Sequence, residues 1–376
     1  MDKEVKRMVR IARPIKERAN EIRQIIERGG WDPRNYPRLD KIPDKYPKNL
    51  CVVAVDTGFT EPSVELTGGR LVIVIKAHAF FGCEPRCIGG KEATALVKFL
   101  ESEEGIAKPI SKIVERRFIV DLLKRKELGE LHVDMIILDG ELIPRIPPGY
   151  RRRSERLMMK LYTRIIDLSN EMFKLAFNTK TALVGVIKRS YGHFLGPLIN
   201  MPGLELNDKA IATYILKPGE YIDLGYYFDI IDKTRGVLEN LEKKKVKGSI
   251  VRTLKQRVEW LRKIVDNVDW SGHTRIILYK SWVPSYFSLA TKVEVWPSDN
   301  LPTDSILGYL AASTGINGVP YQIDVVDSMC RIPRSLLLET QQQLFRDLTI
   351  KLEDVKLAMS IAGLTNPEKM ARIGFK

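Results

Sequence analysis

Two short apolar runs that lead into an aspartate determine the fold expected for this chain: CVVAVDTGFT at 51–60 and MIILDGEL at 135–142. Apolar, β-branched runs bounded by turn residues predict buried strands. A third run, RLVIVIKAHAFF at 70–81, predicts a strand that forms a hairpin with the first. Asp56 and Asp139 each follow an apolar run and precede a turn. We therefore predict that both carboxylates lie at the ends of buried strands.

The rest of the sequence predicts an α/β protein with a mixed sheet flanked by helices. Helical periodicity covers 3–28, 91–100, 109–128, 154–177, 238–266, 303–313 and 335–361; strands are expected at 181–188, 274–280 and 290–296, and short β or irregular elements at 205–234. Pro14 is expected to break or kink the first helix, which ends at Gly29-Gly30. We predict two units: 1–48, an amino-terminal helix and Pro-rich connector, and 49–376, a domain with a basic helical insertion at about 235–268.

The composition favours an intracellular protein that binds a polyanion. The 376 residues include 61 Lys and Arg against 47 Asp and Glu, a formal charge of +14. Such a charge attracts nucleic acid, although basic proteins without nucleic-acid partners are also common. The amino terminus is charged throughout, and no apolar run is long enough for a membrane helix. We therefore expect a cytoplasmic protein with no membrane role.

The four cysteines are too few to build a disulfide scaffold in a chain of this length. Either Cys83 pairs with Cys87, or all four, including Cys51 and Cys330, stay as buried thiols. His78, Cys83 and Cys87 lie close in sequence, but no further ligand pair completes a tetrahedral zinc set. A structural zinc site is the less favoured alternative.

The paired aspartates are the main candidates for chemistry. Two carboxylates on adjacent strands repel each other, and a bound Mg²⁺ or Mn²⁺ removes that repulsion. The alternative is that each aspartate only forms an Asx-turn with the glycine that follows, as most Asp-Gly pairs do. Two matching occurrences after apolar strands favour the functional interpretation, with Asp56 bridging two cations that hydrolyse a phosphodiester bond.

Five motifs occur in an order and spacing that resemble the NurA family of archaeal nucleases. They are VAVDTGFT, the helix with IVERRF, ILDGEL, GVIKRS and the late GVPYQIDVVDSM, and they cover the chain from about Val52 to its end. The resemblance implies a ribonuclease H-like fold, Mn²⁺-dependent cleavage of DNA and a homodimer. It also implies association with the hexameric HerA translocase in DNA end resection.

The resemblance assigns roles to individual residues. Asp56 resembles the family's first metal carboxylate, Glu115 the second and Asp139 the third, while Lys188 resembles the lysine near the scissile phosphate. Glu115 has an alternative as a solvated helix residue, and Lys188 as a surface lysine.

One motif departs from the family pattern. Where the family has Gly-Tyr-Pro and a histidine seven residues later, this chain has Val319 and Asp327. Asp327 can still bind a hard cation through oxygen, and Asp324 lies one turn away if the segment is helical. The tyrosine hydroxyl and the imidazole are absent, which puts full activity in doubt.

Two basic runs are candidates for DNA binding, with solvated surface as the alternative for each. They comprise Arg151, Arg152 and Arg153, and Lys243, Lys244, Lys245 and Lys247. Tyr150, Trp260, Trp282 and Tyr286 are candidates for base stacking, with core packing as the alternative.

Two rival functions follow from the same residues. Asp56-Thr57-Gly58-Phe59-Thr60 fits the DxGxT phosphate loop of actin-like ATPases, but a second phosphate loop and a Walker A sequence are absent. The other rival is a non-catalytic subunit that docks on a translocase and threads DNA without cutting it. Val319 and Asp327 are the residues that favour this second rival.

Overall fold

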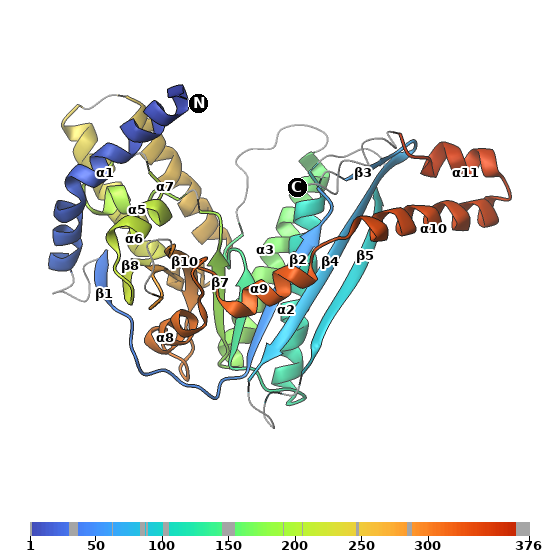
Figure 1. The fold of residues 1–376 in the computed structure, drawn as a ribbon, viewed down its shortest axis with the longest axis horizontal. Coiled ribbons are helices and arrows are strands. Elements are labelled where there is room, and N and C mark those ends of the chain that lie inside the picture. Colours follow the sequence, from blue (N-terminus) through green and yellow to red (C-terminus); the bar gives the residue numbers. More distant parts are fainter. Residues whose placement is uncertain are drawn as a thin grey trace.

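A single mixed sheet runs through the molecule. The computed structural model describes residues 2–29, 37–61, 63–82, 87, 89–100, 105–144, 155–190, 192–204, 206–245, 248–283 and 288–365. Within these residues ten strands pair in the order β1-β8-β9-β10-β7-β6-β2-β4-β3, and β5 pairs with β4 (Figure 1).

The strands are β1 (Arg38–Lys41), β2 (Val52–Phe59), β3 (Val64–Leu66), β4 (Gly69–Phe81), β5 (Lys91–Leu100), β6 (Met135–Asp139), β7 (Ala182–Ile187), β8 (Glu220–Tyr226), β9 (Arg275–Tyr279) and β10 (Thr291–Trp296). The helices are α1 (Asp2–Gly29), α2 (Ala107–Glu127), α3 (Glu155–Asn178), α4 (Leu195–Leu198), α5 (Asp208–Ile215), α6 (Tyr227–Lys243), α7 (Ser249–Asn267), α8 (Thr303–Ser313), α9 (Tyr321–Met329), α10 (Arg334–Leu352) and α11 (Val355–Ala362), with a short 3-10 helix at Ser271–His273.

The centre of the sheet has ribonuclease H-like topology, as the sequence predicts. Strands β2, β4 and β5 form an antiparallel meander, while β6 pairs parallel with β2 and β7 pairs parallel with β6. Helix α2 connects the meander to β6, and α3 connects β6 to β7. Parallel neighbours need such crossovers, which place helices against the sheet. The expected fold class, a mixed α/β sheet flanked by helices, is confirmed.

The two faces of this sheet have separate cores because strand side chains alternate in direction. Val53 and Val55 of β2 lie in one core with residues of α2, α3, α6 and α7. Val52 and Ala54 lie in the other, with residues of α8 and α9. This alternation fixes which side of the sheet each polar residue at a strand end faces.

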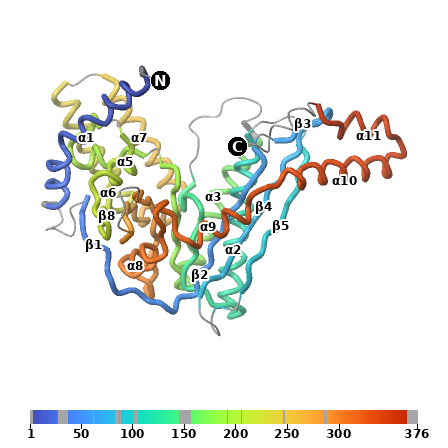
Figure 2. The backbone as a smooth tube through the Cα atoms, in the orientation of Figure 1, coloured from blue at the N-terminus to red at the C-terminus, as the bar shows by residue number. Residues whose placement is uncertain are grey.

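The amino-terminal helix packs on the rest of the chain. Ile15, Ile22 and Ile26 are buried in the main core, and Arg23 forms an ion pair of 2.7 Å with Glu220 at the start of β8. Figure 1 shows α1 beside α5, α6 and α7, and Figure 2 shows the connection from β1 to β2 running along the lower edge of the molecule. This half of α1 therefore packs within the chain. The expected break at Pro14 is wrong, because α1 continues through it.

Residues 91–100 form strand β5, so the helix expected there is wrong. Ala93, Leu96, Val97 and Leu100 have helical spacing, and the segment is rich in helix-forming residues. Pairing with the 13-residue strand β4 overrides that preference. The polar and apolar alternation of a half-buried strand is missing because the first nine residues of β5 are exposed.

Two long helices expected from periodicity are each interrupted. The basic segment divides between Lys243 and Ser249: Lys245 has a φ of 55° after α6 ends, and Gly248 has a φ of 145° just before α7 begins. The carboxy-terminal segment divides at Glu353, and Asp354 caps α11 by accepting from the amides of Lys356 and Leu357. Part of 205–234 is regular, since it holds α5, β8 and the start of α6.

The cysteine pairing also differs from expectation. Cys87 forms a disulfide with Cys51, with Cα atoms 5.0 Å apart, and Cys330 is a buried thiol. Phe81 at the end of β4 pairs with Val52 at the start of β2, so the end of β4 lies beside Cys51. The zinc set with His78 is therefore wrong, because the disulfide occupies Cys87; Cys83 lies outside the described residues.

Among the described residues, we find no helix with both the length and the apolar character needed to cross a membrane.

Candidate metal centre

Strand alternation places three predicted site residues on one side of the sheet. Asp56 continues the set of Val52 and Ala54, and Asp139 continues that of Met135 and Ile137, all of which face α8 and α9. Lys188 follows β7 in the same phase, after Val184 and Val186. Parallel pairing of β2, β6 and β7 brings these positions to the same edge. Asp56 is not the end of its strand, however; β2 continues to Phe59 against β4 alone.

Helix α9 supplies a third carboxylate to this edge. It packs on β2, β4 and β6, and Asp327 faces the two strand aspartates. One oxygen each from Asp56, Asp139 and Asp327 lies within 4.8 Å of the others. The ammonium of Lys188 lies 2.7 Å from Asp139 Oδ2 and 3.2 Å from Asp327 Oδ1. The structure thus brings together four of the five predicted catalytic residues.

The cluster is electrostatically unfavourable when its carboxylates are ionised. Burial, followed by the charges of Asp139 and Glu115, raises the pKa of Asp56 to about 7, although the Thr57 amide donates to Asp56 Oδ1 at 2.6 Å. Burial also raises the pKa of Asp139, against the opposing effect of Lys188. For Lys188, burial opposes the charge, but its bonds to both aspartates raise its pKa. Carboxylate oxygens at this spacing suit a hard divalent cation.

Glu115 is not part of the three-carboxylate group. It lies on α2, which covers the opposite face of the sheet, and its carboxylate accepts from Lys112 at 2.9 Å. Thr57 Oγ1 donates to Glu115 Oε2 at 3.5 Å, so the two faces meet at the strand edge. The alternative of a solvated residue is wrong, since Glu115 is fully buried. Its charge acts on Asp56 without sharing the group's short distances.

A cleft of about 450 Å³ opens over the cluster, and its rim is cationic. The rim cations besides Lys188 are Lys108, Lys112, Arg189 and Arg331. None of these four was singled out from the sequence. Lys108 and Lys112 have a four-residue spacing in the first turns of α2, which places them on one helix face, and this signal was available.

The turn after Asp139 is held by two buried charged side chains. Arg116 of α2 donates to the carbonyl of Leu142 at 2.9 Å. Glu294 of β10 accepts from the amides of Leu142 at 2.7 Å and Ile143 at 3.1 Å. Gly140 adopts a φ of 127°, which favours glycine. These contacts fix the path of the chain that carries Asp139, and sequence periodicity gave no sign of them.

The DxGxT motif has a packing explanation. Residues 56–59 continue as strand β2. A Cβ at Gly58 would lie 2.1 Å from the carbonyl oxygen of Cys330, so glycine is needed for the close approach of the end of α9. The motif therefore brings Asp327 to the strand edge, which does not support the phosphate loop of an ATPase.

Of the other predicted binding residues, those that the structure describes do not line this cleft. Lys243, Lys244 and Lys245 are exposed at the end of α6. Trp282 is partly buried against the α8 and α9 core. Arg151, Arg152, Arg153, Lys247, Tyr150 and Tyr286 lie outside the described residues.

Comparison with solved structures identifies the fold. The NurA nuclease of Sulfolobus solfataricus matches with a TM-score of 0.50 at 11% sequence identity, covering 93% of this chain and 98% of that chain. A structure of NurA with manganese gives 0.48 at 12% identity, covering 93% and 98%, and one of NurA bound to dAMP and manganese gives 0.44 at 12%, covering 88% and 94%. The first match shows a shared fold.

The sequence comparison identifies the family. The family model described as the NurA domain matches residues 52–332, which is most of the chain. The chain therefore belongs to the NurA family, as the motif order indicated. Comparison with curated proteins finds no significant match.

Proposed function

We propose that this protein is a divalent-cation-dependent nuclease that hydrolyses phosphodiester bonds of DNA. The observation that carries the proposal is the group of three aspartate oxygens within 4.8 Å of one another, at the floor of a cleft with a cationic rim. Membership of the NurA family supports the same activity.

The cation we propose is Mn²⁺, with Mg²⁺ as the alternative. All three candidate ligands are carboxylates, which suit hard cations, and neither thiol nor imidazole belongs to the group. When bound, the cation supplies positive charge to the transition state and a more acidic water molecule. The family resemblance supports Mn²⁺.

The residues of the chain divide the remaining work. Asp56, Asp139 and Asp327 hold the cation, and Lys188 binds the phosphate that approaches it. Glu115 makes the electrostatic potential at Asp56 more negative. It is a candidate additional cation ligand if its contact with Lys112 breaks. Arg116 and Glu294 hold the turn of Asp139 and act as positioning residues.

The cleft suits a DNA strand because Lys108, Lys112, Arg189 and Arg331 can bind successive phosphates. We propose that the basic runs at Arg151–Arg153 and Lys243–Lys247 extend this contact. A steep fall of affinity with salt supports the proposal, and a flat response contradicts it.

We further propose that the protein works as a homodimer with a HerA-type hexameric translocase in DNA end resection. The family resemblance supports both partners. Strand β5 supports the dimer, because Leu96, Val97 and Phe99 are exposed at an edge of the sheet. A non-catalytic subunit of the same complex is the second candidate function, favoured by Asp327 at the position of the family's histidine.

A cation titration with end-labelled DNA tests the activity. Single- and double-stranded DNA is incubated with the protein in EDTA, Ca²⁺, Mg²⁺ or Mn²⁺, and both the length and the mobility of the DNA are recorded. We expect shortened products in Mn²⁺ and none in EDTA. DNA that is shifted but keeps its full length in every cation refutes the nuclease and supports the non-catalytic subunit.

A further inference from the structure

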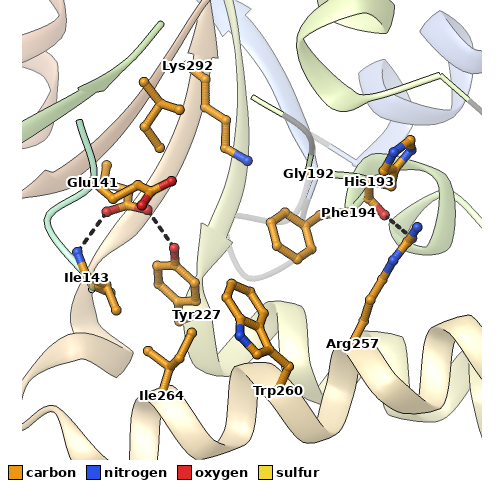
Figure 3. Close-up of a pocket in the computed structure, with 12 residues that line it drawn as sticks. Glu141, Ile143, Gly192, His193, Phe194, Tyr227, Arg257, Trp260, Ile264 and Lys292 are labelled. Atoms are coloured by element: carbon orange, nitrogen blue, oxygen red, sulfur yellow. Dashed lines mark hydrogen bonds between the residues drawn. The ribbon is translucent and has the colours of Figure 1, made fainter. Parts of the chain in front are cut away.

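A second cavity lies beside the aspartate cleft, on the side of the sheet covered by α6 and α7 (Figure 3). Its volume is about 130 Å³. Glu141 and Ile187 line both this cavity and the cleft. Glu141 lies two residues after Asp139, and Ile187 directly precedes Lys188. The two spaces therefore lie next to each other at the ends of β6 and β7. A molecule that occupies one is within reach of the other.

The walls of the cavity are aromatic and apolar. Figure 3 shows the rings of Phe194, Tyr227 and Trp260 around the same space. Trp260 and Ile264 share a face of α7 because they are four residues apart, so this helix forms one wall. Trp260 is only partly buried, whereas Phe194 and Tyr227 are buried. Such a surface binds a flat ring by stacking.

Polar groups enter this apolar space from two sides. The buried side chain of Lys292 points into it, with Nζ 3.5 Å from Asp208 Oδ2 and 4.8 Å from the centre of the Phe194 ring. Glu141 also lines the cavity. A Cβ at Gly192 would lie 2.7 Å from Lys292 Nζ and 3.0 Å from Asp208 Oδ2, so glycine leaves room for this ion pair. A donor and an acceptor thus face a ring that enters.

We propose that this cavity receives one unstacked nucleobase of the DNA strand whose phosphate lies at the aspartate cluster. The proposal rests on the proposed nuclease function and adds to it the state of the substrate. An apolar cavity of roughly 150 Å³ accepts a benzene ring, so a space of about 130 Å³ holds at most one ring and excludes a base pair. The base next to the cleaved bond is therefore unpaired.

The test measures binding rather than cleavage, in EDTA so that DNA stays intact. Fluorescence anisotropy compares a short oligothymidylate with an abasic chain of the same length and backbone. Wild-type protein is expected to bind the oligothymidylate about tenfold more tightly, because each stacked base contributes to affinity. Trp260→Ala removes most of this difference and leaves affinity for the abasic chain unchanged, whereas Trp260→Phe retains part of it.

Trp270→Ala is the matched control. Trp270 is partly exposed and stacks on Phe177. Both line another pocket, together with Lys180 and Trp296, and this pocket lies at the opposite end of β7 and β10. This variant is expected to discriminate between the two ligands as wild type does. Equal affinity of wild-type protein for both ligands, or a Trp260→Ala protein that still discriminates fully, overturns the proposal.

The same proteins in Mn²⁺ separate the two proposals. Base discrimination without cleavage refutes the nuclease and leaves the base cavity supported. Cleavage without base discrimination refutes the cavity and leaves the nuclease supported.

Discussion

Strands β2 and β5 both flank β4, yet one is buried and the other is exposed. Helices α2 and α9 cover β2, which carries Asp56 into that dry environment. Strand β5 presents Leu96, Val97 and Phe99 to water, with exposed fractions of 36%, 43% and 41%. A buried carboxylate and an exposed apolar strand are both unfavourable in the isolated chain. We propose that a cation compensates the buried carboxylate and that a second copy of the chain covers the exposed strand.

The largest effect on cleavage is expected from a substitution of Asp56, the residue of β2 at the proposed cation site. Asp56→Asn keeps the shape of the side chain but removes the charge that holds the cation, so Mn²⁺-dependent cleavage should fall by roughly 10³-fold. Product formation on labelled DNA measures the rate, and anisotropy in EDTA checks that binding persists. Asp40→Asn, at an exposed aspartate of β1, is the control. Wild-type cleavage by Asp56→Asn would exclude Asp56 from the metal site.

The pKa of Asp56 predicts how pH and metal affect stability. Burial and the neighbouring charges raise it from 3.8 to about 7. Between these values the folded protein holds a proton that the unfolded chain has lost, so the free energy of unfolding without metal falls as pH rises from about 4 to about 7. The loss reaches a few kcal/mol.

Thermal unfolding at several pH values, in EDTA and in Mn²⁺, measures this linkage. Mn²⁺ binds the ionised cluster, so its stabilising effect should be larger at pH 8 than at pH 5. Asp56→Asn should reduce the pH dependence in EDTA and leave the part that comes from other buried carboxyls with a raised pKa, such as Asp139. Equal stabilisation by Mn²⁺ at both pH values, or an unchanged pH profile in the variant, would contradict the linkage.

Lys188 is expected to contribute less than Asp56. Its ammonium lies between Asp139 and Asp327, where it opposes a divalent cation but attracts a phosphate. Lys188→Met should therefore lower the half-saturating Mn²⁺ concentration while the maximal cleavage rate falls roughly 10²-fold. Lys180→Met, an exposed lysine just before β7, is the control. A lower rate with weaker Mn²⁺ binding would show that Lys188 only supports the structure.

The sequence was sufficient for the buried strand and its aspartates. Apolar runs located β2, β6 and β7 and the polar residues that follow them, and the structure then shows Asp56, Asp139 and Lys188 on one side of the sheet. Asp327 needed the resemblance, because its place depends on how the end of α9 approaches Gly58. Arg116 and Glu294 could not be found, since both act on the backbone of Leu142 from distant segments.

The prediction for residues 91–100 was wrong because this strand, unlike β2, is exposed. Periodicity reports which faces of an element are buried, and β5 has almost no buried face within the chain. The helical spacing of its apolar residues therefore does not correspond to a buried face. If a second copy covers this strand, its buried face is formed only in the dimer, and the sequence pattern of β5 reflects that interface.

The smallest effect is expected on that interface. Phe99→Lys adds a charge to the exposed face of β5 and should weaken the proposed homodimer about tenfold, with an unchanged melting temperature of the monomer. Sedimentation equilibrium measures the dimer, and Leu128→Lys, at an exposed apolar residue after α2, is the control. A dimer of unchanged affinity would exclude β5 from the dimer interface. If Phe99→Lys weakens the dimer and Leu128→Lys does not, a second copy of the chain covers β5. The strand would then depend on a partner from outside the chain, as Asp56 depends on a cation.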